Sequence, residues 1–92
     1  MTIREVADIL GATEYCGEDK YESEVTSGFG SDLMSDVLAF VSDQQVLLTG
    51  LVNAQVIRTA DLMDISCIVL VRNKKPDSEM VELARSKGIV LM

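Results

Sequence analysis

The sequence of 92 residues contains no histidine, and it offers few of the patterns that mark a catalytic site. Without histidine, the commonest general base and the commonest metal ligand are both missing, and no Ser-His or Cys-His nucleophile can be assembled. In "TSGFGSD", Gly28 and Gly30 lack the following lysine of a P-loop and the third glycine of a dinucleotide-binding loop. We therefore expect no enzyme activity, no metal site and no cofactor.

Long hydrophobic runs are missing as well. The longest, "CIVLV" and "IVLM", are far shorter than the ~20 residues that a membrane span requires. The N-terminal stretch "MTIREVADIL" carries acidic residues where a signal peptide would have an apolar core. We expect a cytoplasmic protein that does not enter a membrane.

Cysteine is scarce, and its two copies are far apart in the chain. Cys16 and Cys67 form neither a close metal-binding pair nor the framework of a secreted disulfide scaffold, so we expect free thiols in a reducing compartment. Cys67 lies within an apolar stretch and is expected in the core, whereas Cys16 lies in a polar segment and could be exposed.

Positive charge is in short supply, because the net charge is −7, with −8 in residues 1–43 and +1 in residues 44–92. An acidic chain without a basic stripe is a poor candidate for binding nucleic acid. Hydrophobic residues make up 48% of the sequence, which is high for a domain too small to bury all of them. We expect the remaining apolar surface to contact a partner protein or a second copy, most simply in a two-fold homodimer.

The first half of the chain contains weak secondary-structure signals. Thr2 and Glu5 form a possible capping box that predicts a helix over about residues 3–10, ended by Gly11. "EVTSGFG" alternates enough to suggest a half-exposed strand, and a second helix is expected to begin near Ser31. The apolar face expected on that helix consists of Leu33, Met34, Val37, Leu38 and Val41.

From Gln45 onward the pattern becomes regular. "VLLT", "CIVLV" and "IVLM" are short, continuously apolar stretches, as expected of strands buried on both faces of a parallel sheet. Two helices of crossover length lie between them, with Asn53 and Asp77 as expected N-caps. The sequence therefore predicts a single domain over residues 1–92, a small three-layer α/β domain with a mostly parallel sheet of about four strands and right-handed βαβ crossovers.

Ligands of parallel sheets collect at the carboxyl ends of the strands, and two loops are expected there. "TGLVN" offers a hydroxyl, a glycine and the N-terminus of a helix, and "RNKKPD" offers three positive charges. The candidate ligand-binding residues, for a nucleotide or another small phosphorylated ligand, are Thr49, Gly50, Asn53, Arg72, Lys74 and Lys75.

Each of these residues also fits a purely structural role. Gly50 suits a turn that needs positive φ, Asn53 suits a helix cap, and Lys74 and Lys75 suit a solvated turn. Asp32 and Asp36, at helical i, i+4 spacing, fit either a cation site or a solvated helix face, and the second interpretation is favoured.

The segments "SGFGSDLMSDVLA" and "VLLTGLVNAQVIRTADLMDISCIVLVRNKKPDSEMVELARSKGIVLM" resemble the DRTGG domain over nearly the whole chain. The resemblance is strongest in "SDLMSDVLA", in the strand-TG-helix step and in "KKPDSEMVELARSKGI". The Asp-Arg-Thr-Gly-Gly string itself is not present, and Leu51 to Gln55 stand where many members carry other polar residues.

The resemblance implies an α/β domain of the kind found beside CBS pairs and in certain phosphotransacetylases, similar to the N-terminal domain of bacterial HPr kinase. Stand-alone members occur near iron-only hydrogenase genes. It implies a regulatory or associative role without established catalytic residues. We therefore expect a non-catalytic regulatory or association module that pairs with itself; the alternative is a small-anion or adenine-nucleotide sensor.

Overall fold

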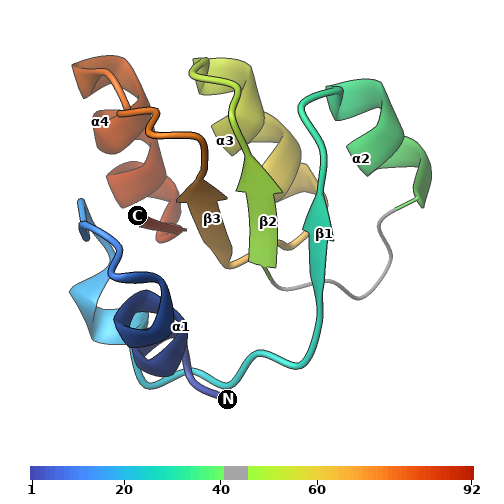
Figure 1. Cartoon of the computed structure of the whole chain (residues 1–92). Helices are drawn as coiled ribbons and strands as arrows, with labels where there is room; N and C mark the ends of the chain where they lie inside the picture. The colour runs from blue at the N-terminus through green and yellow to red at the C-terminus, as the bar shows by residue number, and fades with distance from the viewer. Residues whose placement is uncertain (41–45) are drawn as a thin grey trace.

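The computed structural model describes residues 1–40 and 46–92 and confirms the α/β class (Figure 1). One sheet of four parallel strands has the order β1-β2-β3-β4, which is also their order in the chain. The strands are β1 (Gly28–Gly30), β2 (Val46–Thr49), β3 (Cys67–Leu70) and β4 (Val90–Leu91). The helices are α1 (Ile3–Leu10), α2 (Met34–Phe40), α3 (Ala54–Leu62) and α4 (Ser78–Lys87), with a short 3₁₀ turn at Glu18–Lys20.

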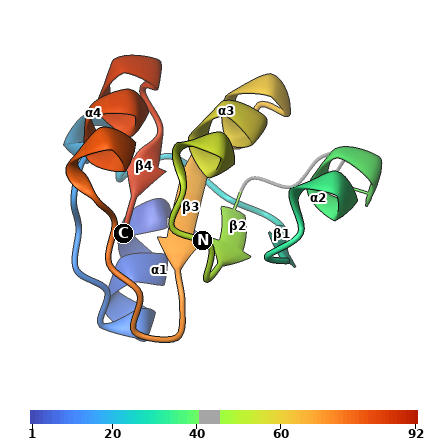
Figure 2. The same cartoon turned by 90° about the horizontal axis from the view of Figure 1, so that it is seen from above.

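The helices lie in two layers, one on each face of the sheet. Helices α2, α3 and α4 each connect two neighbouring strands and cover one face, and α1 lies on the other face (Figure 2). Because the strand order follows the chain and the three connecting helices share a face, all three crossovers have the same hand. The predicted three-layer architecture is therefore confirmed, and its sheet is wholly parallel.

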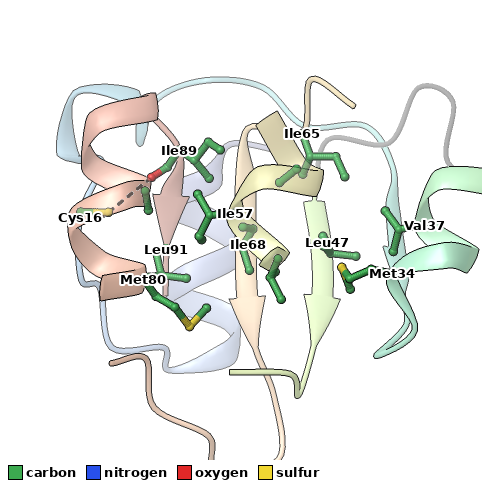
Figure 3. Close-up of a cluster of buried hydrophobic side chains, with 13 residues drawn as sticks. Cys16, Met34, Val37, Leu47, Ile57, Ile65, Ile68, Met80, Ile89 and Leu91 are labelled. Atoms are coloured by element: carbon green, nitrogen blue, oxygen red, sulfur yellow. Dashed lines mark hydrogen bonds between the residues drawn. The ribbon is translucent and has the colours of Figure 1, made fainter. Parts of the chain in front are cut away.

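The larger core lies between the sheet and the three connecting helices (Figure 3). Alternate strand residues, including Leu47 and Ile68, point toward the helices, and Ile57 of α3 packs onto them. The core contains Cys16, Met34, Val37, Leu47, Val56, Ile57, Ala60, Ile65, Ile68, Met80, Ala84, Ile89 and Leu91. The continuously apolar strands of the second half were correctly predicted, because a strand covered on both faces needs no polar alternation.

The second core lies under α1. Ile3 and Ala7 of that helix pack toward β3 and β4, together with Tyr21 from the segment that follows. The predicted capping box holds the helix start, since Glu5 N donates to Thr2 Oγ1 (3.1 Å) and Thr2 N donates to Glu5 Oε1 (2.9 Å). Gly11 ends the helix in the left-handed conformation, at φ 61°.

Two expectations for the first half of the chain were wrong in part. The apolar face of α2 is narrower than predicted, because Met34 and Val37 are buried while Leu33 and Leu38 are 59% and 46% exposed. Val41, the fifth expected member of that face, lies outside the described residues. The strand expected in "EVTSGFG" is confined to Gly28–Gly30.

Cys16 is also a correction, since it is buried although its sequence neighbours are polar. Its Sγ donates to the main-chain oxygen of Ile89 (3.4 Å), and its main chain pairs with Leu91 at the edge of β4. Both cysteines are free, as predicted, and Cys67 lies in the core as expected. Among the described residues, no helix is both long enough and apolar enough to cross a membrane.

Candidate functional site

The carboxyl ends of β1, β2 and β3 are joined by one side chain, that of Asp32. Asp32 follows β1, and its Oδ1 accepts hydrogen bonds from the Gly50 main-chain N–H (2.6 Å) and from Thr49 Oγ1 (3.2 Å), both at the end of β2. Its Oδ2 forms an ion pair with Arg72 Nη2, from the loop after β3. The two loops expected to form one site therefore do meet, and a carboxylate of the chain itself lies between them.

Thr49 is fully buried, and its hydroxyl both donates and accepts a hydrogen bond. It donates to Asp32 Oδ1 and accepts from the Leu51 main-chain N–H at 3.2 Å. A buried hydroxyl needs such partners, because burying it unpaired costs about 1–3 kcal/mol. In this arrangement Thr49 stabilises the turn from β2 to α3.

Gly50 lies beneath the Arg72 side chain and does not have a positive φ. The glycines with positive φ are Gly11, Gly17 and Gly88. A Cβ on Gly50 would overlap the guanidinium of Arg72, which lies across the turn. The expectation of a positive φ at Gly50 is therefore wrong, and a side chain at this position would require the Arg72 guanidinium to move.

The loop after β3 has an unusual backbone at its start. Arg72 and Asn73 have φ of 58° and 61°, the left-handed conformation, which asparagine adopts more readily than arginine. The Arg72 side chain returns over Gly50 to Asp32, while Lys74 and Lys75 continue toward the other face of the sheet. Arg72 is paired with Asp32, and all three basic residues of this loop also line one hollow on the α1 face of the sheet.

Asn53 acts as a helix cap. Its Oδ1 accepts from the Gln55 main-chain N–H (2.8 Å) at the N-terminus of α3. The same role falls to Asp77 at α4, whose Oδ1 accepts from Met80 N (2.8 Å). Asn53 is therefore placed at the edge that was predicted, with its side-chain oxygen already engaged.

The electrostatics of the cluster favour an ionised Asp32. The Gly50 N–H and then the Arg72 guanidinium lower the pKa of Asp32 below its ordinary value of 3.8, and the Thr49 hydroxyl adds to the effect. The Asp32 carboxylate therefore occupies the Gly50 N–H, the Thr49 hydroxyl and one guanidinium nitrogen of Arg72. The cluster binds its own anion and holds three loops together.

Sequence reasoning missed Asp32, because its helical spacing to Asp36 drew attention away from the strand before it. A signal was present: the expected strand in "EVTSGFG" ends two residues earlier, so a parallel sheet brings Asp32 to the same edge as Thr49. Asp32 lies before α2, and the predicted pairing of Asp32 and Asp36 on one helix face is therefore wrong. Among the residues that the structure describes, no group of three or more acidic or cysteine side chains could hold a metal ion.

Lys74 and Lys75, together with Arg72, line a hollow of about 400 Å³ on the α1 face of the sheet. The opposite wall of this hollow is the end of α1 and the segment after it, from Leu10 to Tyr15. Its floor comes from Leu48, Val69, Val71 and Met92.

Comparisons of the chain with protein-family models, with curated proteins and with solved structures each gave no match.

Proposed function

We propose that the chain is a non-catalytic regulatory module that associates with a second copy of itself through the outer edge of β1. The observation that carries the proposal is the difference between the two edges of the sheet. At β4, Tyr15 N donates to Leu91 O (2.9 Å) and Leu91 N donates to Cys16 O (3.4 Å), so this edge is covered. At β1, no segment of the described chain pairs with the outer edge.

The main chain of β1 has groups available for such a contact. Ser31 N donates to Leu48 O (3.0 Å) on the inner side, and the main-chain groups of a strand alternate between its two sides. The N–H and C=O groups of Gly28 and Gly30 therefore point away from β2. Unpaired groups in a row on an edge strand form a template for pairing with another chain.

Apolar surface lies beside this edge on both faces of the sheet. On one face are two exposed leucines, Leu33 just before α2 and Leu38 within it. On the other face is a hollow of about 520 Å³, mainly apolar, which runs from α1 to Gly28. Its lining consists of Met1, Val6, Val25, Thr26, Ser27, Gly28, Val46 and Leu48. A contact that adds a strand at β1 would also cover these surfaces, as expected of a stable dimer interface.

The absence of catalysis is part of the proposal. The titratable cluster at the carboxyl edge is closed on itself, because Asp32 satisfies Thr49, Gly50 and Arg72. A regulatory or associative role is also what the resemblance to the DRTGG domain implies. Two buried free thiols suit a reducing compartment, so we propose a cytoplasmic location.

Sedimentation equilibrium at micromolar concentration tests self-association directly. We expect a species of twice the 10.0 kDa mass of the single chain. Gly30→Pro removes one outward N–H and should shift the protein to the single-chain mass. A wild-type protein that sediments at 10.0 kDa would contradict the proposal.

Gly30→Ala provides the matched control. A Cβ at this position meets Leu48 O at 3.7 Å and Leu48 Cβ at 4.0 Å, which are ordinary contacts, and the outward N–H remains. We expect Gly30→Ala to keep the dimer. Retention of the dimer in both variants would show that the β1 main chain does not form the interface, provided that circular dichroism finds both variants folded.

A further inference from the structure

The hollow beside Lys74 and Lys75 combines apolar surface with positively charged side chains. Its volume of about 400 Å³ falls in the range of roughly 300–1,000 Å³ that is usual for small-molecule sites. The floor is apolar, from Leu48, Val69 and Met92, and the lining also includes Lys74, Lys75 and the Asp32-paired Arg72. A pocket of this kind can hold a molecule with an apolar body and an anionic end.

The lysine charges are available to a ligand. Within the described residues neither Lys74 nor Lys75 takes part in an ion pair, whereas Arg72 is paired with Asp32. None of the side chains that line the hollow is a carboxylate.

The wall opposite the lysines can contact a flat apolar group. Tyr15 is half-buried, and its main chain is held by the hydrogen bond to Leu91 O. Leu10, at the end of α1, is 52% exposed although it is large and apolar. A ring placed over the floor would cover part of Leu10 and meet the Tyr15 side of the hollow, with gains from buried apolar area.

We propose that this hollow binds a small organic phosphate whose apolar part is a flat ring. The ring lies on the floor between Leu10 and Val71, and the phosphate lies at Lys74 and Lys75, which act as point charges. This inference is independent of self-association, because no residue of the outer edge of β1 lines the hollow.

Calorimetric titration with 1-naphthyl phosphate tests the proposal. Inorganic phosphate, which carries only the anionic group, and 1-naphthol, which carries only the ring, are the control ligands. We expect 1-naphthyl phosphate to bind at least about tenfold more tightly than either, because each half contributes separately. Its binding should weaken as salt rises, since the lysines are exposed to solvent. Amide shifts in NMR should move at Gly11, Thr13 and Asn73, which are part of the lining.

Two pairs of variants separate the hollow from general effects of charge and apolar surface. Lys74→Ala with Lys75→Ala should weaken binding by about fivefold to tenfold, as expected for two exposed charges. Lys20→Ala with Lys87→Ala removes the same charge elsewhere and should leave binding nearly unchanged. Leu10→Ser should weaken it, whereas Ile9→Ser, at a neighbouring position that is 70% exposed and outside the hollow, should not.

Three results would overturn the proposal. The first is no binding of 1-naphthyl phosphate below about 1 mM, which corresponds to only ~4 kcal/mol. The second is inorganic phosphate or 1-naphthol binding as tightly as the combined probe. The third is equal weakening by the two lysine pairs, which would show a general effect of net charge. Circular dichroism of each variant gives the control for folding.

Discussion

Two buried threonines should respond in opposite directions to the same substitution. Thr49 and Thr59 are 0% and 2% exposed, and they are the buried polar residues of the described chain. The Thr49 hydroxyl has two hydrogen-bond partners, whereas Thr59 Oγ1 has none. Valine has the shape of threonine with a methyl group in place of the hydroxyl, so each Thr→Val change tests the hydroxyl alone.

The size of each change in the free energy of unfolding follows from the hydrogen-bond partners of the hydroxyl. Thr59→Val removes a hydroxyl that is buried without compensation, and we expect a gain of about 1 kcal/mol in the free energy of unfolding. Thr49→Val leaves the Leu51 N–H without its acceptor, and we expect a loss of about 1–2 kcal/mol. Thr59 lies in α3 and Thr49 in β2, but Val and Thr have similar helix propensities and are both favoured in strands.

Urea unfolding followed by circular dichroism measures both changes. The slope with denaturant should stay constant, so that the shift in midpoint reports stability. Each kcal/mol should also move the thermal midpoint by about 4–8 °C in a domain of this size. All variants must be compared at one protein concentration, because association raises the apparent stability.

A loss of more than about 0.5 kcal/mol in Thr59→Val would refute the reasoning, since that exceeds the usual scatter of neutral substitutions. It would show that the hydroxyl has a partner, such as a bound water. A gain in the free energy of unfolding in both variants would show that the surroundings of the methyl group, not hydrogen bonding, decide the outcome.

The charge of Asp32 and the two thiols give further predictions. Because the Gly50 N–H and Arg72 lower the pKa of Asp32, its contribution is present above its ordinary pKa of 3.8 and is lost as pH falls through the lowered value. The difference in thermal midpoint between wild type and Asp32→Asn should therefore shrink in acid, and a constant difference would contradict this. Titration with a thiol reagent should find two thiols in denaturant without reductant, and fewer would indicate a disulfide. In the native protein the reaction should be slow, because burial raises the pKa of Cys16 and raises that of Cys67 to about 12; a fast reaction would contradict the burial.

The second half of the fold could be predicted because local signals agreed with its tertiary environment. Strands β2, β3 and β4 are buried on both faces, so their sequences are apolar throughout. Asn53 and Asp77 cap the next helices by contacts within three residues of themselves. Such contacts are visible in the sequence because they are local.

The first half could be predicted less well, because its structure depends on distant partners. Val25 was expected in a strand, yet it belongs to the core under α1. Cys16 is buried because residues 15 and 16 pair with β4, more than 70 residues away. Asp32 is bound to residues 18 and 40 positions away, and no short motif signals such a cluster.

The strand order explains why the expected anion site differs from the observed arrangement. In open parallel sheets the ligand crevice forms where the strand order reverses and neighbouring loops diverge to opposite faces. Here the order follows the chain without reversal, so the loops after β1, β2 and β3 lead to helices on the same face. They lie close enough for Asp32 to join Gly50 and Arg72 directly. Space for a ligand or a partner is left instead where α1 covers the opposite face incompletely, beside Lys74 and Lys75 and beside β1.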